Sequence, residues 1–461
     1  MIKLLLRIVL YLTVFTIFVG GIGWIGYTKS QSNFLLSYRD TPIPLIKELK
    51  KPQYDPKKPT VAVLLGDRMT EAFDFLGPYE VFAMTNSYNV FAVAPDNKVK
   101  SLTGGLDIVP HYSFRELKDL LGHSPDIIVV PNIRIVDKKS YEPVRKWIQE
   151  NYTNNNTILS ICSGSRNLAD AGLLDGKEAA AHWSNIGQRI KDYPSTKWKR
   201  DQRYVKDGNI ISSAGLSSGI DASLYVISQN LGNSVSQKVA KLLNYPNYSF
   251  VNNPKITPYY FGAEDSVFPL NQAFQWNKYK TGVLLYNNMG IGEVASIIDI
   301  FGNIGSDKIF TISNSEQPIV TKYGLNLLAR YSMNNAPRLD RLMLAGSEAK
   351  SIASNEIEIW EDIGNINELI FMHSGSANRY VYEAPFEYLA KQEGIQTAKY
   401  AIKRFEYRGN NLKLEGKSLS IEIYGNLFLI CIISLIISLI IDKSLFRNKN
   451  LVRKSKQKQS M

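Results

Sequence analysis

The clearest candidate for covalent chemistry in this chain is a cysteine at a turn. A short β-type run, TILSI (157–161), ends at Cys162, and the small residues 163–165 lead into a helix-like stretch. This order is typical of a nucleophile elbow, in which a strained strand-to-helix turn exposes the nucleophile and leaves backbone N–H groups free. A thiol there would have its thiolate favoured, as nucleophilic catalysis requires. The alternative, that Cys162 is a small buried apolar residue, stays open from this motif alone.

Short β-rich runs alternate with helix-like stretches through the same part of the chain. The runs are TVAVLL (60–65), NVFAVAP (89–95), DIIVVP (126–131) and TILSIC (157–162). Strands that alternate with helices form a parallel sheet that is covered on both faces. The sequence therefore predicts an α/β domain whose last run of this series ends at the cysteine.

Three motifs in this region resemble one known family. They are FDFLGPYEVF (73–82), ICSGSRNLADAGLLDGKEAAAHW (161–183) and DGNIISSAGLSSGIDASLYVI (207–227). In this order they look like the ThiJ/PfpI family of the class I glutamine amidotransferase-like superfamily. The branch that they resemble most includes the sensory half of AraC-type regulators and the isonitrile hydratases. The resemblance covers residues 60 to about 244, roughly two fifths of the chain.

The resemblance implies a flavodoxin-like sandwich with Cys162 as the nucleophile and Asp74 as the acid that hydrogen-bonds it. A carboxylic acid beside a thiolate can hold it by a charge-assisted hydrogen bond or can shuttle its proton. The backbone N–H of Ser163 would help to stabilise an oxyanion. His182 belongs to the His-Trp pair of the family and is either a base or, more simply, a structural hydrogen-bonding residue.

Other reactive residue types fit less well. A Gly-x-Ser-x-Gly pattern at 215–219 contains Ser217, but the matching segment of the family is a packing turn, so a second nucleophile is not expected there. No spacing typical of metal ligands links the histidines, which are His111, His123, His182 and His373. We therefore predict neither a metal site nor a cofactor.

Two departures from the family pattern bear on activity. The family usually has Pro-Gly-Gly after the third strand, where a glycine amide completes the oxyanion hole, whereas this chain has Pro131-Asn132-Ile133. Arg166 replaces a small or apolar residue just after the elbow and would bind an anion or block the pocket. We therefore predict a small-molecule-sensing or scaffolding module with a vestigial cysteine pocket, a pseudoenzyme. The alternative is a cysteine-dependent hydrolase or hydratase that uses Cys162 with Asp74.

The middle of the chain contains an internal repeat. A shift of about 219 positions aligns GLDIVPHYS (105–113) with GLNLLARYS (324–332), and ILSICSGS (158–165) aligns with LIFMHSGS (369–376). His373 then stands in the nucleophile position and Glu293 near the acid position, so the second copy is incomplete. We predict a family domain at 59–244, a linker at 245–278 and a degenerate copy at 279–420, which pair as an intramolecular pseudo-dimer.

Two apolar segments are long enough to cross a membrane. Residues 8–27 and 423–441 contain no charge, and at 1.5 Å per residue each spans roughly 30 Å of hydrocarbon. The first exceeds the usual length of a signal-peptide core and lacks an Ala-x-Ala-like site, so an uncleaved anchor is favoured over a cleaved signal. Gly21, Gly23 and Gly26 follow no strand, which indicates helix packing rather than a dinucleotide fingerprint.

The charges near the ends of the chain predict its orientation. The tail at 442–461 contains seven Lys and Arg residues and one acid. Lys3 and Arg7 lie in the N-terminal segment at 1–7. Because basic segments stay on the cytoplasmic side, both termini are predicted to be cytoplasmic. The folded region would then be extracytoplasmic and joined to the first helix by a connector at 28–58. Basic residues just after the first helix weaken this charge asymmetry.

The amino-acid composition and net charge limit the classes of partner that the protein is expected to bind. Of the 461 residues, 44% are hydrophobic and 21% charged, which is ordinary for folded domains. The net charge of +12 comes largely from the tail, and no basic, aromatic-interleaved face or helix-turn-helix signal is present, so nucleic-acid binding is not expected. The two cysteines, Cys162 and Cys431, form no disulfide framework. The expected partners are a membrane and an unidentified small molecule.

Overall fold

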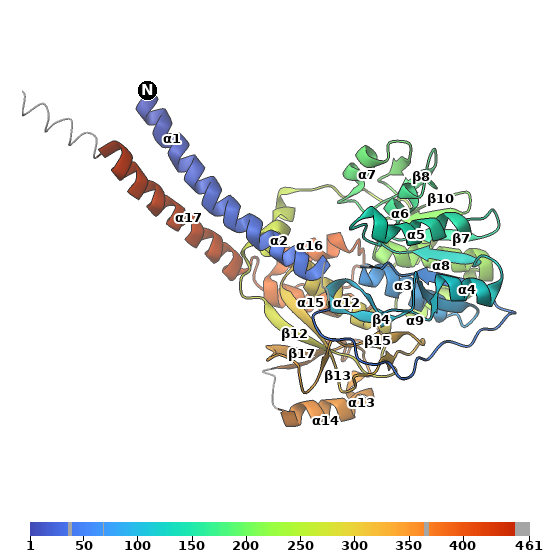
Figure 1. Ribbon diagram of the computed structural model, residues 1–461. Helices are drawn as coiled ribbons and strands as arrows, with labels where there is room; N and C mark the ends of the chain where they lie inside the picture. The colour runs from blue at the N-terminus through green and yellow to red at the C-terminus, as the bar shows by residue number, and fades with distance from the viewer. Residues whose placement is uncertain (36–38, 68, 364–367, 448–461) are drawn as a thin grey trace, which may run out of the picture.

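The computed structural model describes residues 1–35, 39–67, 69–363 and 368–447. Two α/β bodies lie side by side, and two long helices leave them together in one direction (Figure 1). We call the seven-stranded sheet with its helices the first body and the five-stranded sheet with its helices the second body. The basic tail predicted at 442–461 lies outside the described residues from residue 448 onward.

The first body contains a mostly parallel sheet in the order β10-β11-β7-β6-β1-β2-β5, in which only the β10–β11 pair is antiparallel. Its strands are β1 (Thr60–Leu64), β2 (Asn89–Ala94), β5 (Tyr112–Ser113), β6 (Ile127–Val130), β7 (Thr157–Ser160), β10 (Tyr204–Asp207) and β11 (Ile210–Ser213). A two-stranded sheet, β8 (Glu178–Ala180) with β9 (Lys197–Lys199), lies beside it. The alternating α/β pattern thus folds as the flavodoxin-like sheet that was predicted.

Helices cover both faces of this sheet because successive strand side chains point in opposite directions. In β1, Val61 and Val63 belong to one core cluster with residues of α3 and α8, whereas Ala62 and Leu64 belong to another with residues of α4 and α5. The helices are α3 (Ala72–Ala83), α4 (Phe114–Leu121), α5 (Lys138–Asn151), α6 (Gly164–Asp170), α7 (Ile186–Asp192), α8 (Ser217–Leu231), α9 (Asn233–Leu242) and α10 (Ser249–Asn252).

The second body is built on a wholly parallel sheet in the order β16-β13-β12-β17-β18. This is the order in which β5-β2-β1-β6-β7 follow one another in the first sheet. The strands are β12 (Tyr279–Leu284), β13 (Asp307–Ser313), β16 (Tyr331–Ser332), β17 (Arg341–Leu344) and β18 (Leu369–Phe371). The helices are α12 (Ile291–Ile304), α13 (Ala349–Ile352), α14 (Ser354–Ile363), α15 (Glu383–Glu393) and α16 (Ile395–Arg404).

A small sheet in the order β14-β15-β4-β3 joins the two bodies. Its central pair is antiparallel, and Ile108 of β4 lies opposite Leu327 of β15. One apolar core cluster contains side chains from both bodies. The strands of the small sheet are β3 (Lys100–Ser101), β4 (Asp107–Val109), β14 (Ile319–Val320) and β15 (Asn326–Leu328).

The helices α3 and α12 face each other across the junction and exchange hydrogen bonds. The backbone N–H of Phe73 in α3 donates to Oδ2 of Asp299 at 3.0 Å. In return, the N–H of Gly292 in α12 donates to Oε2 of Glu80 at 3.1 Å. Each carboxyl group thus satisfies a first-turn N–H that has no partner within its own helix. All four residues are buried.

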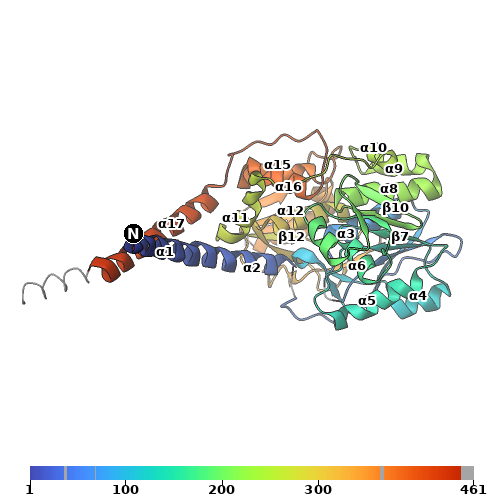
Figure 2. The ribbon, with the colours of Figure 1, turned by 90° about the horizontal axis from the view of Figure 1, so that it is seen from above.

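The two long helices pack against each other in antiparallel directions (Figures 1 and 2). The first consists of α1 (Ile2–Phe15), the π-helical turn η1 (Thr16–Gly20) and α2 (Gly21–Leu35); the second is α17 (Ile421–Asp442), followed by a π-helical turn (Lys443–Arg447). Both are long and apolar enough to cross a membrane. Arg7 and Asp442 form an ion pair of 2.8 Å at the end remote from the bodies.

The segment predicted as a linker at 245–278 contains regular structure that packs on these helices. A 3₁₀ turn (Ala263–Ser266) leads into α11 (Val267–Phe274), which contacts α2 and α17. A Cβ at Gly26 would lie 2.1 Å from the carbonyl oxygen of Ala273, and one at Gly23 would lie 3.0 Å from the ring of Phe274. Gly23 and Gly26 of the first apolar segment therefore allow close helix packing, whereas a Cβ at Gly21 would touch nothing.

The raised pKa of Glu80 predicts how the free energy of unfolding depends on pH. Burial first, and then the charge of Glu293, raise the pKa of Glu80 from 4.5 to about 8. A carboxyl whose pKa rises on folding stabilises the fold fully only below its unfolded value, so this contribution is lost between about pH 4.5 and 8. The difference corresponds to roughly 5 kcal/mol. In Glu80→Gln, which keeps an acceptor for Gly292, the free energy of unfolding should fall less over this interval.

The measurement is denaturant unfolding of the detergent-solubilised protein from pH 4.5 to 8. Glu150→Gln on the exposed side of α5 is the control and should follow the wild type. Parallel curves for wild type and Glu80→Gln would contradict the prediction.

Candidate functional site

Cys162 occupies a strained turn between β7 and α6. Its φ is +56°, a value that non-glycine residues adopt infrequently and often at functional sites. The turn is held by hydrogen bonds from the backbone N–H of Gly164 to the carbonyl of Ile161 at 2.8 Å and from Oγ of Ser165 to the carbonyl of Cys162 at 2.9 Å. A Cβ at Gly164 would lie 2.0 Å from the carbonyl oxygen of Val130, so this position needs glycine for the close approach to β6.

Asp74 lies beside the thiol, in the first turn of α3. Its Oδ1 accepts a hydrogen bond from the backbone N–H of Leu216 at 3.3 Å, and its own N–H donates to Oε2 of Glu71 at 2.6 Å. Asp74 and Cys162 are close enough for each to alter the pKa of the other. The structure thus brings these two predicted residues together and adds Glu71, which the sequence did not indicate.

Burial opposes ionisation of both groups. It raises the pKa of the Cys162 thiol well above its usual value, and the charges of Asp74 and Glu71 raise it further. Burial, followed by the charge of Glu71, likewise raises the pKa of Asp74 well above its usual value. A thiol with a raised pKa is a poor nucleophile near neutral pH, since the thiolate is the reactive form. This environment therefore disfavours the thiolate that the elbow motif predicts.

The backbone N–H groups around the thiol differ in their contacts. Those of Ser163 and Asn132 lie near Cys162 and Asp74 respectively and act to lower the pKa values of these groups. The N–H of Ile133 donates to Oδ1 of Asn167 at 3.2 Å. An oxyanion hole requires preorganised donors that are free to face a developing negative charge. The amide of Ile133 is thus engaged within the protein.

His182 is a structural residue by its contacts. It is buried, its Nδ1 lies 2.7 Å from Oγ of Ser184, and its Nε2 lies 2.8 Å from the backbone carbonyl of Arg404 in α16. Burial, together with the charge of Arg404, lowers the pKa of His182 to about 3. Trp183 donates from Nε1 to the carbonyl of Lys403 at 3.1 Å. The His-Trp pair thus ties the first body to α16.

Ser217 is also engaged in a buried network. Its hydroxyl donates to the carbonyl of Glu406 at 2.7 Å and accepts from Nη2 of Arg203 at 3.0 Å. Arg203 in turn is paired with Asp221, and all of these side chains are buried. Ser217 therefore belongs to the junction with the second body and is not exposed at a turn.

A cavity of about 590 Å³ opens beside the elbow. Ser163, Asn132 and Arg166 line it, whereas Cys162 is not among its lining residues. Residues of α2, of the segment around α11, of α7 and of α16 also contribute to its walls. The remaining lining residues are Tyr27, Gln31, Leu35, Met69, Glu71, Thr103, Arg134, Ser184, Asn185, Arg189, Phe261, Phe268, Pro269, Tyr400 and Arg404.

Sequence reasoning missed most of this cavity. Glu71 could have been noticed as a helix-capping acid three residues before Asp74. Arg134, Arg189 and Arg404 stand in segments that are distant along the chain, and no spacing rule connects them. Only the packing of α2 and α16 against the first body brings them together.

The corresponding region of the second body contains a smaller cavity of about 210 Å³. Glu293 and His373 both line it. Nδ1 of His373 accepts from the backbone N–H of Gly346 at 3.1 Å, and burial lowers the pKa of this histidine. His373 is therefore a hydrogen-bonded neutral residue in the position that the sequence alignment assigns to the nucleophile.

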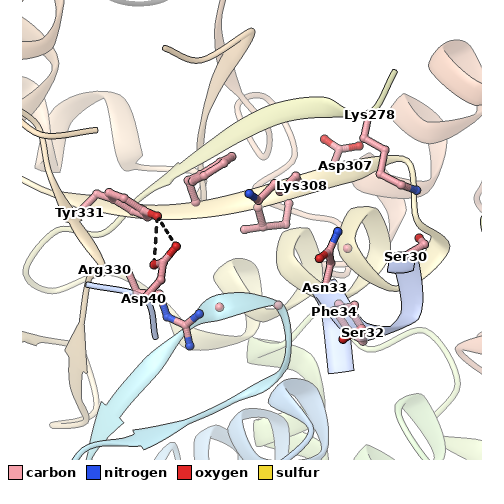
Figure 3. A pocket seen from close by; sticks show the side chains of 15 residues that line it. Ser30, Ser32, Asn33, Phe34, Asp40, Lys278, Asp307, Lys308, Arg330 and Tyr331 are labelled. Carbon is pink, nitrogen blue, oxygen red and sulfur yellow. Dashed lines mark hydrogen bonds between the residues drawn. The ribbon is translucent and has the colours of Figure 1, made fainter. Parts of the chain in front are cut away.

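A third cavity, of about 230 Å³, lies where α2 meets the second sheet (Figure 3). Ser30, Asn33 and Phe34 of α2 face Lys308 of β13 across it (Figure 3). Oη of Tyr331 lies 3.2 and 3.3 Å from the two carboxylate oxygens of Asp40. Among the residues that the structure describes, no group of three or more His, Cys, Asp and Glu side chains could hold a metal ion.

Comparisons with known sequences match the first body. A profile of the DJ-1/PfpI family matches residues 59–229. The isonitrile hydratase of Pseudomonas putida is 28% identical over 183 residues, which cover 38% of this chain and 74% of that protein. The HTH-type transcriptional regulator CdhR of Pseudomonas aeruginosa is 33% identical over 108 residues, 22% of this chain and 32% of the regulator.

Solved structures are similar over the same share of the chain. A DJ-1 superfamily protein from Salmonella typhimurium is 20% identical with a TM-score of 0.36, and it covers 41% of this chain and 99% of its own. An AraC family transcriptional regulator from Pseudomonas putida is 18% identical with a TM-score of 0.35, and it covers 40% of this chain and 99% of its own.

The close contact between Gly215 and the elbow predicts that a side chain at position 215 destabilises the fold. Gly215 has a φ of +127°, and a Cβ there would lie 2.6 Å from Cβ and 2.9 Å from Sγ of Cys162. Gly215→Ala should lower the free energy of unfolding by about 2–4 kcal/mol, through backbone strain and overpacking together. Adding Cys162→Gly, which removes the clashing atoms, should restore part of the loss.

Thermal unfolding of the three proteins would check this. Gly176→Ala is the matched control, since Gly176 also has a positive φ, but a Cβ there would touch nothing. Equal losses in Gly176→Ala and Gly215→Ala would refute the steric part of the argument.

Proposed function

Residues 59–229 are a DJ-1/PfpI family domain, and from this premise we propose that the protein is a membrane-anchored small-molecule-sensing or scaffolding module with a vestigial cysteine pocket. The observation that carries the proposal is the state of the elbow. The thiol and its acid are both buried and have raised pKa values, and the amide of Ile133 donates to Asn167. Such a site retains the architecture of the pocket without a prepared nucleophile.

The relatives support both a binding and a catalytic alternative. One matched protein is named an isonitrile hydratase, and others are named transcriptional regulators. The placement of Asp74 beside Cys162 favours the alternative function, a cysteine-dependent hydrolase or hydratase. The raised pKa of the thiol favours the module, because activation of a cysteine nucleophile requires a lowered pKa.

The second body fits the proposal as a degenerate copy that pairs with the first. The same spacing of 219 positions relates Phe73 to Gly292 and Glu80 to Asp299, the residues of the two reciprocal hydrogen bonds. It also relates Ile108 to Leu327, which lie opposite each other in the antiparallel pair β4–β15. Contacts that repeat in both directions about one centre are the mark of an isologous interface. This supports an intramolecular pseudo-dimer.

The proposed anchoring rests on α1–α2 and α17. They run side by side and away from the bodies, and their chain directions would place both termini on one side of a bilayer (Figure 2). With the basic tail on the cytoplasmic side, the two bodies are extracytoplasmic. The ion pair between Arg7 and Asp442 would lie near the cytoplasmic face.

Alkylation of Cys162 tests the proposal for the site. In a Cys431→Ser background, iodoacetamide near neutral pH should label Cys162 at least ten times more slowly in the folded protein than after denaturation, because the thiol is buried and protonated. Asp74→Asn should leave the rate unchanged, since Asp74 is already neutral. Fast labelling that Asp74→Asn slows would establish the enzyme alternative instead.

Fusion reporters test the membrane topology. The protein should stay in the membrane fraction after alkaline carbonate extraction, and a fluorescent protein fused to either end should be fluorescent in the cytoplasm. Truncation after residue 417 removes α17, so a reporter at the new end should report the opposite side. A C-terminal reporter that gives the same result with and without α17 would show that this helix does not cross.

A further inference from the structure

The cavity beside the elbow carries an unusual concentration of positive charge. Four arginines from different segments line it: Arg134 after β6, Arg166 in α6, Arg189 in α7 and Arg404 at the end of α16. We propose that this cavity binds an organic anion with a phosphate or carboxylate group, and that the bound anion ties α2 and the second body to the elbow. The inference rests on the proposed sensing function and names its ligand class.

The hydrogen-bond donors of the cavity are incompletely satisfied. Nε of Arg166, Nε of Arg189 and Nε2 of Gln31 are all buried and have no hydrogen-bond partner. Arg189 is only 8% exposed, and its ion pair with Asp192 is a long one of 3.4 Å. Buried polar groups are nearly always hydrogen-bonded, and three unmatched donors along one cavity call for an acceptor-rich ligand.

The lining of the cavity also contains too few acidic side chains to balance the charge of the four arginines. Glu71 is the one carboxyl among the residues that line this cavity in the described parts of the chain. Asp299 lies close to Glu71, and burial followed by the charge of Glu71 raises the pKa of Asp299 well above its usual value. One carboxyl group therefore faces four guanidinium groups in the lining.

Arg166 and Arg189 are close enough to repel each other. Burial lowers the pKa of Arg189, and the charge of Arg166 lowers it further. A bound phosphate or carboxylate would accept charge-assisted hydrogen bonds from both guanidinium groups and offset this repulsion. The pairing of these two arginines thus suits an anionic ligand.

The rest of the lining indicates what accompanies the anionic group. A volume of about 590 Å³ is that of a pocket for a small organic molecule and is far larger than one phosphate needs. Phe261, Phe268, Pro269 and Tyr400 contribute apolar and aromatic side chains to the lining, and the guanidinium of Arg404 lies 5.1 Å from the centroid of the Phe268 ring. The ligand therefore carries an apolar or aromatic part beside its anionic group.

The cavity also includes the helix that leads to the proposed membrane. Tyr27, Gln31 and Leu35 follow one another at four-residue spacing and so form one stripe along α2, which lines the cavity. Arg404 brings in the second body, and its Nε donates to Oδ1 of Asn303 at 3.0 Å. An anion held by Arg166 and Arg404 would connect α2, the second body and the elbow. The anionic group could come from a soluble metabolite or from a lipid headgroup.

Thermal unfolding of the full-length protein in neutral detergent tests the proposal. Sodium phosphate and sodium citrate, each compared with sodium chloride at equal ionic strength, should raise the Tm of the wild type. Arg166→Gln and Arg189→Gln should weaken the apparent affinity for phosphate by roughly tenfold or more, the loss of a charge-assisted contact. Without an added anion, both variants should unfold at or above the wild-type Tm, because repulsion is relieved.

Arg115→Gln is the matched control, because this exposed arginine of α4 lies away from the cavity. It should keep the full response to phosphate. The proposal is overturned if neither anion raises the Tm beyond chloride, or if Arg115→Gln loses the response as much as Arg166→Gln does.

Nanodiscs distinguish the two sources of the anion. If the headgroup of a lipid occupies the cavity, phosphatidylglycerol mixed into phosphatidylcholine should raise the Tm of the wild type but not of Arg166→Gln. If the ligand is soluble, only the added phosphate or citrate should do so. Slow alkylation of Cys162 with no response to any anion would reject the ligand class and leave the sensing function standing. Fast alkylation with an anion response would reject the sensing function and leave the ligand class.

Discussion

The reciprocal hydrogen bonds between α3 and α12 hold the two bodies of the protein in one register. Asp299 satisfies the first turn of α3, and Glu80 satisfies the first turn of α12, in a core from which water is excluded. Removal of either carboxyl group would leave a buried N–H unpaired, which costs about 1–3 kcal/mol for each N–H. Because α3 also carries Asp74, this contact places the acid of the elbow within a cluster of carboxyl groups from both bodies.

That placement decides the chemistry of the elbow. Glu71, Asp74 and Asp299 are buried together, so their mutual repulsion and desolvation favour protonated forms. The same environment opposes the thiolate of Cys162, because burial and the charges of Asp74 and Glu71 outweigh the opposing charge of Arg404. The backbone turn of a nucleophile elbow is kept, but its surroundings raise the pKa of the thiol.

The second body and the terminal helices give the first body a different pocket from the one that its own sheet would form. α16 supplies Arg404, α2 supplies Gln31, and the segment around α11 supplies Phe268. These contacts come from parts of the chain outside the matched family residues. A ligand bound there would touch α2 and both bodies at once, so its occupancy and the relative position of these parts would be thermodynamically linked.

The sequence by itself determined the order of strands and helices in the first body, the turn at Cys162 and the two apolar helices, because these follow from periodicity, small residues and charge-free runs that are local along the chain. It also paired Asp74 with Cys162 by family resemblance. It missed α11, which it interpreted as linker, and it missed Arg134, Arg189 and Arg404. Tertiary structure alone decided the protonation of the elbow and the charge of the cavity. Both depend on burial and on neighbours that are hundreds of positions apart, and no local pattern encodes such distances.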